Sequence, residues 1–213
     1  MSIIINKAKQ IVLYFLSLWW RFKYPHISST TRLGSSIWVF ARKNLYMDEN
    51  TNLSKGTVIM NTRAKFIMKK NSGAAIGLLA ITGNHLTVPG VWFKQVTDTV
   101  KAELDVHNEL DRDIIVEEDV WIGANVTLLS GVHVGRGCIV GAGSVLRSNT
   151  PPYAILTGNP AKIVGFRFAP KECVKHEQEL YSEEERIPLE VLEKNYYKYY
   201  INRIKEIKDF VRL

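Results

Sequence analysis

The chain has 213 residues, of which 46% are hydrophobic and 23% are charged. This composition excludes a disordered or low-complexity chain, and the length suffices for one domain with a sizeable core. Two cysteines, Cys138 and Cys173, are too few for a disulfide framework and suit a reducing compartment. The formal net charge is +7, and residues 1–47 supply all of it, with seven Lys or Arg and no Asp or Glu. Because residues 48–213 are balanced, a nucleic-acid-binding protein is not expected.

The basic N-terminal segment contains an apolar, uncharged run from Ile11 to Trp20. This is about half of the ~20 residues that a helix needs to span a bilayer. The run ends in Trp19-Trp20 and is followed by Arg21 rather than by a small-residue cleavage site, so secretion is not expected either. We expect a helix over residues 1–28. Its apolar side either packs on the protein or a neighbouring subunit, or lies in a membrane interface with lysines toward anionic lipid. Both alternatives predict a cytoplasmic protein, the second at the inner face of the membrane.

Residues 114–148 repeat with a period of six. An α-helix repeats at about 3.6 residues and an amphipathic strand at about two, so this period indicates a short strand and a tight turn, repeated. Stacked coils of this kind bury a continuous aliphatic ladder, as in a parallel β-helix. The apolar residues fall in two series, Val116, Ile122, Leu128, Val134, Val140 and Leu146, and Ile114, Val120, Val126, Val132 and Cys138.

The repeat divides the chain into three parts. Weaker hexads extend upstream to about Leu33, with the register lost around residues 65–72, where we expect an irregular coil or a turn. A polar stretch at about 83–112 interrupts the repeat, and such insertions in solenoids form loops, often on the binding face. After Phe168 the apolar spacing becomes three or four, which predicts helices that cover the β-helix or a neighbouring subunit. We therefore expect an N-terminal helix (1–28), a β-helix domain (29–168) and a C-terminal helical extension (169–213).

Three segments carry a resemblance to the hexapeptide-repeat acyltransferases: residues 115–124 (IVEEDVWIGA), 141–145 (GAGSV) and 151–162 (PPYAILTGNPAK). The resemblance covers roughly residues 30–168 and is to sugar O-acetyltransferases of the maltose, galactoside and capsular-polysaccharide type. It implies a mainly β protein, a left-handed parallel β-helix of triangular section. It also implies a homotrimer that binds acetyl-CoA in a cleft between neighbouring subunits.

The long loop opens on Asn84-His85, and the resemblance implies that His85 is the catalytic base. The chemistry is suitable, because a sugar hydroxyl must lose its proton as it attacks the thioester, and imidazole has a solution pKa of about 6.5. An amide side chain could stabilise the developing oxyanion, for which Asn84 is a candidate. The base needs an acceptor on its other ring nitrogen. The position relative to the Trp121 motif favours Glu109 among the loop acids, followed by Asp113.

The resemblance also assigns a coenzyme face. Small residues let the pantetheine arm lie along the coils and bond to the backbone, and tight turns require the same residues. Of two basic candidates for the CoA phosphates, Arg147 is displaced by one position from the family's pattern, which leaves Lys162 as the better candidate. Trp92 either stacks on the sugar or the pantetheine arm, or packs the loop down. The expected coenzyme residues are Trp121, Gly123, Ala124, Gly141, Ala142, Arg147 and Lys162.

The same fold occurs in zinc-dependent carbonic anhydrases, which need three histidine ligands, two of them closely spaced. Here His85, His107 and His133 are widely separated along the chain, so no metal site is expected. We predict an enzyme, an acetyl-CoA-dependent O-acetyltransferase, whose acceptor is a sugar or polysaccharide precursor of capsule or O-antigen synthesis. The alternatives are N-acetylation of an amino sugar or nucleotide-sugar, and a non-catalytic trimeric β-helix scaffold.

Overall fold

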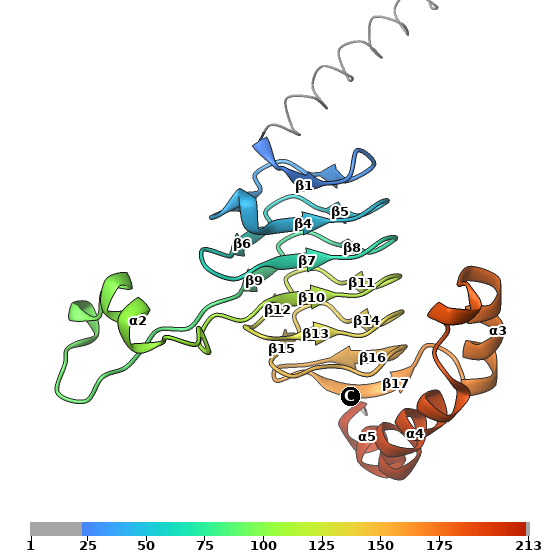
Figure 1. Cartoon of the computed structure of the whole chain (residues 1–213). Helices are drawn as coiled ribbons and strands as arrows, with labels where there is room; N and C mark the ends of the chain where they lie inside the picture. Colours follow the sequence, from blue (N-terminus) through green and yellow to red (C-terminus); the bar gives the residue numbers. More distant parts are fainter. Residues whose placement is uncertain (1–22, 212–213) are drawn as a thin grey trace, which may run out of the picture.

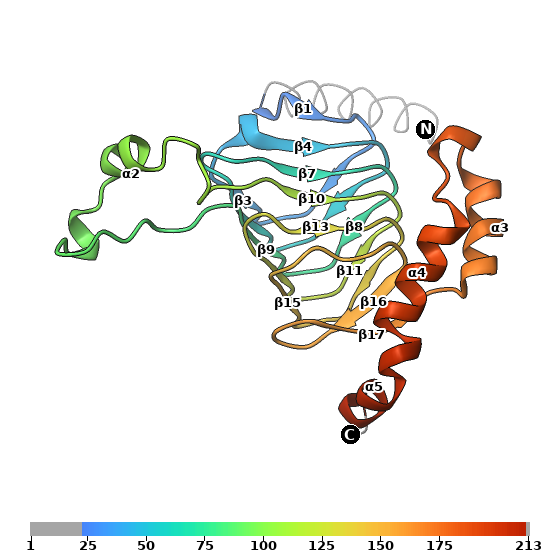
Figure 2. The same ribbon diagram turned by 60° about the horizontal axis from the view of Figure 1, so that its bottom comes forward.

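The computed structural model describes residues 23–211, which form a three-sided parallel β-helix with helices at its C-terminal end (Figure 1, Figure 2). Each coil contributes one short strand to each of three sheets, and the strands of a sheet pair with those of the coils above and below. The predicted mainly β fold with parallel sheets and C-terminal helices is confirmed. Residues 1–22 of the predicted N-terminal helix (1–28) lie outside the described residues, and its predicted end at residue 28 is wrong, because the first strand already begins at His26.

From β1 to β15 the strands follow one another in the order A, B, C along the chain, and the last two strands then return to sheet B. Sheet A holds β1 (His26–Ile27), β4 (Leu45–Met47), β7 (Phe66–Met68), β10 (Ile114–Val116) and β13 (His133–Val134). Sheet B holds β2 (Arg32–Leu33), β5 (Asn52–Leu53), β8 (Gly73–Ala74), β11 (Trp121–Ile122), β14 (Ile139–Val140), β16 (Ala154–Thr157) and β17 (Lys162–Phe166). Sheet C holds β3 (Trp38–Val39), β6 (Val58–Met60), β9 (Leu79–Ile81), β12 (Thr127–Leu128) and β15 (Val145–Leu146). The last strand, β17, pairs antiparallel with β16 and so ends the parallel stack.

The strand register explains the period of six. Trp121 pairs with Ile139, so a regular coil is three hexads long. Phe66 pairs with Ile114, and this coil exceeds three hexads by the whole length of the 83–112 loop. Earlier coils are only slightly longer than three hexads, as the pairs His26 with Tyr46 and Leu45 with Phe66 show. All of these additions lie at one corner, between sheet C and sheet A.

Of the irregular coil or turn predicted at residues 65–72, the irregular coil is wrong, because β7 lies within this segment and pairs regularly on both sides, whereas a turn does occur at residues 70–71. The extra residues of this coil lie just before β7, in the bends after Asn61. The coil from Leu45 to Phe66 is therefore not a whole number of hexads. The apolar positions on either side of it fall out of phase, although the strands themselves are regular.

The corners are turns with left-handed backbone, which glycine, asparagine and aspartate tolerate best. At the corner between sheets B and C the coils also approach closely. A Cβ on Gly123 would lie 2.7 Å from the backbone N of Ala142 and 2.8 Å from the carbonyl O of Val140. The corner residues with positive φ include Asn71 (61°), Gly77 (75°), Asp119 (56°), Asn125 (55°), Gly137 (68°) and Gly143 (71°).

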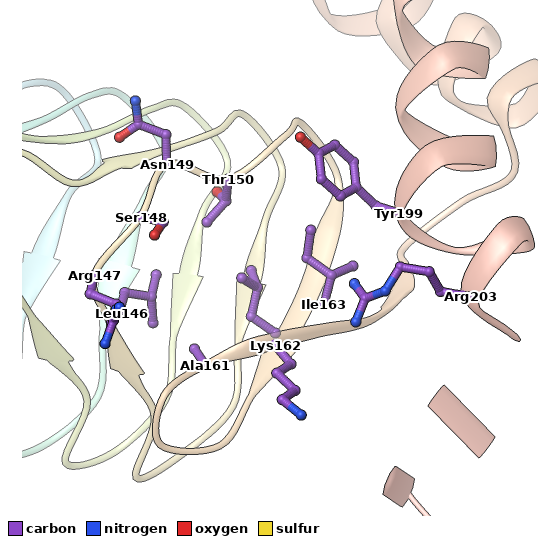
Figure 3. A pocket seen from close by; sticks show the side chains of 11 residues that line it. Leu146, Arg147, Ser148, Asn149, Thr150, Ala161, Lys162, Ile163, Tyr199 and Arg203 are labelled. Atoms are coloured by element: carbon purple, nitrogen blue, oxygen red, sulfur yellow. The ribbon is translucent and has the colours of Figure 1, made fainter. Parts of the chain in front are cut away.

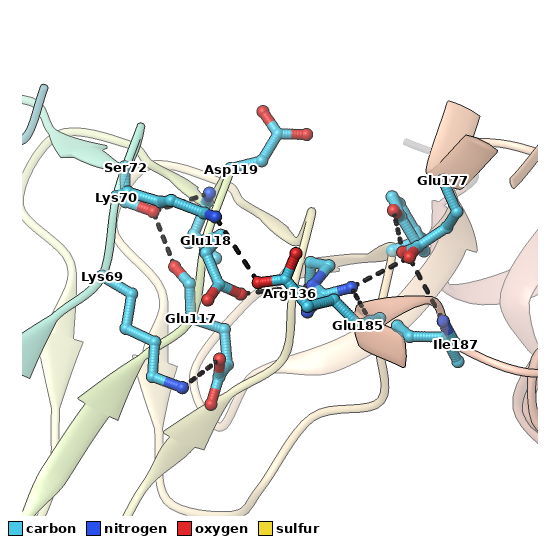
Figure 4. A network of polar contacts seen from close by, with 12 residues as sticks. Lys69, Lys70, Ser72, Glu117, Glu118, Asp119, Arg136, Glu177, Glu185 and Ile187 are labelled. Atoms are coloured by element: carbon cyan, nitrogen blue, oxygen red, sulfur yellow. Dashed lines mark hydrogen bonds and ion pairs between the residues drawn. The ribbon is translucent and has the colours of Figure 1, made fainter. Parts of the chain in front are cut away.

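The C-terminal helices lie beside the last coils (Figure 2) and are attached through a buried polar contact as well as apolar packing. Glu177 is buried, accepts a hydrogen bond from the Tyr153 hydroxyl (2.5 Å) and pairs with Arg136 (2.9 Å; Figure 4). Burial and the Glu177 carboxylate raise the pKa of Tyr153, so its hydroxyl stays protonated and donates. The helices are α3 (Pro170–Leu180), η3 (Glu183–Glu185), α4 (Leu189–Tyr199), η4 (Ile201–Arg203) and α5 (Ile204–Val211).

Within residues 23–211, no helix is both long enough and apolar enough to cross a lipid bilayer.

Two neighbouring isoleucines of β10 can test which side chains of a strand point into the core and which point outward. Ile114 is fully buried, whereas Ile115 is half-buried and faces outward. We expect Ile114→Ala to lower the free energy of unfolding by about 2–5 kcal/mol, because it leaves a cavity in a close-packed core. Ile115→Ala should cost about 1 kcal/mol or less. Denaturation at one protein concentration, followed by circular dichroism, measures both; equal losses would contradict the inward assignment of Ile114.

Candidate active site

The 83–112 loop leaves the β-helix after β9, projects away from the coils and returns before β10 (Figure 1). Its two ends are held side by side by backbone contacts. Gly83 and Asp111 form an antiparallel bridge, the Asn84 N–H donates to the carbonyl O of Leu110 (3.0 Å), and the Arg112 N–H donates to the carbonyl O of Thr82 (2.9 Å). His85 follows Asn84 in the chain, so the predicted base lies next to a backbone position that is held by hydrogen bonds.

A buried ion pair fixes the helix of this loop, α2 (Asp98–Leu104), to the same place. Lys101 is only 9% exposed, and its Nζ lies 2.7 Å from Asp111 Oδ2. The same ammonium donates to the carbonyl O of Asn84 (2.6 Å), and Arg63 Nε lies 3.5 Å from the Asp111 carboxylate. The sequence analysis missed Lys101 and Arg63, because no pattern in the sequence links residues so far apart.

His85 is exposed, and its ring meets that of Phe93 edge-on with centroids 4.9 Å apart. In residues 23–211 no hydrogen bond joins His85 to either predicted acceptor. The Glu109 side chain is exposed, and its backbone N–H is bonded to Asp105 Oδ1 (2.8 Å). Asp113 Oδ1 accepts from the backbone N–H of Lys65 (2.7 Å), so it helps to hold β7 beside β10. The described part of the chain therefore leaves both nitrogens of His85 available.

Trp92, directly before η2 (Phe93–Gln95), is 79% exposed, so it does not pack against its own loop. Asn84 has an exposed side chain and uses its backbone groups to close the loop. The loop thus presents a histidine, an amide and a large aromatic ring to the surroundings of the chain.

The predicted coenzyme residues fall into two groups. Trp121, 51% exposed, faces outward from β11 in sheet B, directly before the close corner of Gly123 and Ala124. The next coil stacks on this corner, since the Gly123 N–H donates to the carbonyl O of Val140 and the Gly143 N–H to that of Ala124, both at 2.8 Å. Gly141 and Ala142 belong to this second corner, so four of the predicted positions lie together.

The second group lies one strand further along the coil. Arg147 and Lys162 both line a cavity of about 250 Å³ between the last coils and the C-terminal helices (Figure 3). The helices add Tyr199 and Arg203 to its lining, neither of which the sequence analysis identified. His85 follows β9 of sheet C and Trp121 lies in sheet B, and within residues 23–211 no hydrogen bond or ring contact joins the two. The described part of one chain thus does not bring its predicted base and coenzyme face together.

Other titratable groups of the β-helix are engaged in structural pairs. Burial disfavours the charge of Glu117, but hydrogen bonds from Lys69 (2.8 Å) and His133 (2.6 Å) outweigh it and hold the pKa of Glu117 below its usual value. Burial raises the pKa of Cys138 and of Cys173 to about 11, so neither is a thiolate nucleophile at neutral pH. Among residues 23–211, no group of three or more His, Cys, Asp or Glu side chains is placed to hold a metal ion.

Comparison with known proteins agrees with the coil geometry. Residues 113–148 match the family of the bacterial transferase hexapeptide (six repeats). This match is confined to residues 113–148. The chain is 36% identical over 105 residues to a probable macrolide acetyltransferase of Lysinibacillus sphaericus, a match that covers 49% of this chain and 54% of that protein. It is also 47% identical over 51 residues to a 2,3,4,5-tetrahydropyridine-2,6-dicarboxylate N-acetyltransferase of Staphylococcus aureus, covering 24% of this chain and 21% of that one.

The chain thus spans about half the length of the first of these relatives and about a fifth of the second. Among solved structures, a maltose O-acetyltransferase from Clostridium difficile 630 superposes with a TM-score of 0.55 at 21% identity, covering 67% of this chain and 70% of that one. A hexapeptide-repeat-containing acetyltransferase from Vibrio cholerae O1 biovar eltor, complexed with acetyl coenzyme A, gives 0.55 at 22% identity, covering 72% and 75%. These likenesses show that the chain shares the fold of these two proteins.

The ion pair at the base of the loop can be tested with Asp111→Asn. The variant leaves the Lys101 ammonium buried without its carboxylate, and breaking such a pair costs about 3–5 kcal/mol. We expect faster hydrogen exchange and faster proteolysis within residues 83–112, while the coils keep the exchange protection of the parent. Glu103→Gln, an exposed acid of α2, is the matched control and should change neither measurement. A loop that stays equally protected in Asp111→Asn would show that the backbone contacts alone hold it.

Proposed function

We propose that this hexapeptide-repeat protein is an acetyl-CoA-dependent acetyltransferase in which His85 is the general base. The observation that carries the proposal is the long insertion of the described β-helix, which offers an exposed histidine beside an anchored backbone. Proteins named as acetyltransferases among its relatives support the same reaction class.

The proposed reaction is a direct transfer. The His85 imidazole takes the proton of the acceptor hydroxyl as that oxygen attacks the thioester carbonyl. The new C–O bond forms, the C–S bond of acetyl-CoA breaks, and the leaving thiolate receives the proton from the imidazolium. An acyl-enzyme is not needed, because the thioester is already activated, and the raised pKa values of both thiols leave the chain without a cysteine nucleophile. Asn84 is the candidate to donate to the oxyanion.

Acetyl-CoA is the proposed co-substrate, with its pantetheine arm along the corner of Gly123, Ala124, Gly141 and Ala142. A side chain at Gly123 has no room there, so the surface of the corner is mostly backbone. Backbone N–H and C=O groups are suitable partners for the two amides of the pantetheine arm. Trp121 would flank the arm with an apolar ring.

We further propose a homotrimer with its sites between subunits. The outward side of sheet C is apolar at its N-terminal end, where Trp38 is 65% exposed and stacks on the exposed Phe40 with centroids 5.7 Å apart. Met60 continues this surface on the next strand. Large exposed apolar patches mark protein contacts. A second copy would cover this patch and would also offer a coenzyme face to His85, which meets none within residues 23–211 of its own chain.

The proposed acceptor is a hydroxyl of a sugar used in surface polysaccharide synthesis. The relative named as a probable macrolide acetyltransferase favours a second candidate, a hydroxyl of a macrolide. An amino-sugar acceptor would give N-acetylation, and a scaffold would give no turnover at all. Both predictions for the basic N-terminal segment remain proposals: its apolar side packs on the trimer, or it holds the protein at the inner membrane face, near lipid-borne precursors.

The central test is His85→Ala with a panel of sugars, amino sugars and macrolides as acceptors. We expect CoA release to fall by about 10²–10⁴-fold, the usual contribution of a general base. The melting temperature should stay that of the parent, because His85 is exposed. His107→Ala, another exposed loop histidine, should keep full activity. Mild alkali separates O-esters, which it cleaves, from amides. Full activity in His85→Ala would refute the mechanism, and a parent chain that never releases CoA would favour a scaffold.

The trimer can be tested with Trp38→Asp. We expect the parent to sediment as three chains and the variant to dissociate, because a carboxylate would be buried in an apolar contact without a partner. Leu180→Asp, which places the same charge at an exposed apolar site on α3, should remain associated. Analytical ultracentrifugation at several concentrations measures this. A monomeric parent, or a Trp38→Asp variant that stays trimeric, would exclude this face as the interface.

A further inference from the structure

The imidazole ring of His85 has one ring contact within residues 23–211, and Phe93 makes it. The two rings meet edge-on, with centroids 4.9 Å apart and an angle of 77° between the ring planes. Aromatic rings prefer this arrangement to face-to-face stacking. Since neither nitrogen of His85 has a hydrogen bond in the same part of the chain, no polar contact there sets the direction of the ring.

The backbone next to His85 is held from both sides. The N–H of Asn84 donates to a carbonyl O of the returning half of the loop (3.0 Å), and the Asn84 carbonyl O accepts from Lys101 Nζ (2.6 Å). Gly83 lies directly against the Asp111 carboxylate, because a Cβ on Gly83 would overlap Asp111 Oδ1. These contacts place the backbone from which His85 extends, so rotation about the side-chain bonds is the freedom that the imidazole keeps.

Phe93 lies on a turn that is closed by its own hydrogen bonds. The Trp92 N–H donates to Gln95 Oε1 (3.2 Å), and the Trp92 carbonyl O accepts from the Gln95 N–H (2.8 Å). The Phe93 carbonyl O accepts from the Val96 N–H (3.2 Å). Because all of these contacts are local, η2 keeps its shape without support from the coils. The loop thus folds back on its own beginning and presents a ring to His85 from a closed turn.

A histidine base is commonly oriented by a carboxylate that accepts a hydrogen bond from its second ring nitrogen. Within residues 23–211 no acid has this contact with His85, since Glu109 is exposed and Asp113 Oδ1 accepts from the Lys65 N–H. An aromatic ring restricts the rotation of the imidazole and occupies neither nitrogen. One nitrogen then stays free for the acceptor hydroxyl and the other for solvent.

The contact is separate from the core of the β-helix. Phe93 is 54% exposed, and His85 is exposed as well. An exposed side chain samples several rotamers, and a base that must be ordered before it reacts loses this freedom in the reaction. A ring that orders the imidazole beforehand lowers this entropy cost, and its loss leaves the fold unchanged.

We propose that Phe93 is a positioning residue of the base, and that its ring holds the His85 imidazole in the orientation from which it takes the proton of the acceptor. This inference rests on the proposed role of His85 and deepens it. Phe93 acts through His85 and contacts neither substrate. The conformation of the base is thereby assigned to an aromatic contact within the loop.

Phe93→Leu and Phe93→Tyr are the matched variants, because leucine removes the ring and tyrosine keeps it. An edge-on aromatic contact is modest, so we expect kcat to fall about three- to tenfold in Phe93→Leu, with the KM for acetyl-CoA and for the acceptor little changed. Phe93→Tyr should keep most of the parent kcat. Val91→Ala, which shortens another exposed apolar side chain of this part of the loop, should match the parent. All three should melt at the temperature of the parent.

Nuclear magnetic resonance of the histidine ring protons tests the contact without turnover. The ring current of Phe93 should displace the His85 resonances from those of His107, an exposed histidine without a ring contact in residues 23–211. The displacement should vanish in Phe93→Leu and remain in Phe93→Tyr. His85→Gln, which removes the resonances in question, assigns them.

An unchanged kcat in Phe93→Leu would overturn the inference, and so would equal losses of kcat in Phe93→Leu and Phe93→Tyr. A rise in either KM at unchanged kcat would show that Phe93 contacts a substrate, and would overturn it as well. A parent that shows the displaced His85 resonances and transfers no acetyl group would contradict the proposed function alone.

Discussion

The stacking of coils by hydrogen bonds between very short parallel strands constrains everything else in this protein. Such a short strand can bury only one or two side chains, so each coil depends on its neighbours for a core. The chain must also turn three times in each regular coil of three hexads, and the left-handed corner positions restrict the residues that can do so. Buried aliphatic residues and small or amide corner residues therefore have to alternate at a fixed period.

This constraint also decides where the chain can carry function. Additions at the corner between sheets C and A leave every strand pair in register, which is why coils longer than three hexads stack as well as the regular ones. The 83–112 loop still has to be held in place, because it adds nothing to the ladder of the core. The Lys101–Asp111 ion pair and the backbone contacts of Asn84 do this at the base of the loop, next to His85.

The sequence predicted those features that depend on local repetition. The strands from Ile114 to Leu146 follow from the six-residue period, because the coils there have the regular length. At residues 65–72 the same period predicted an irregular coil or a turn and missed the strand β7, since the extra residues before β7 shift the phase. Pairs such as Lys101 with Asp111 could not be predicted, because only folding of the insertion brings them together. The convergence of Arg147 with Arg203 has the same character: they lie far apart in the sequence, and the turn of β17 and the helices closes that gap.

The last coil and the segment after it differ from the middle coils in the groups that they expose. Corners at which a Cβ has no room expose mostly backbone, which binds neutral amides well but supplies no full charge. In this chain the antiparallel strand β17 and the helices after it end the ladder, and they bring Lys162 and Arg203 to the surface of the last coil. The side chains of this closing segment are no longer constrained by the period of six, whereas cations of the coils such as Lys69 and Arg136 are held in ion pairs.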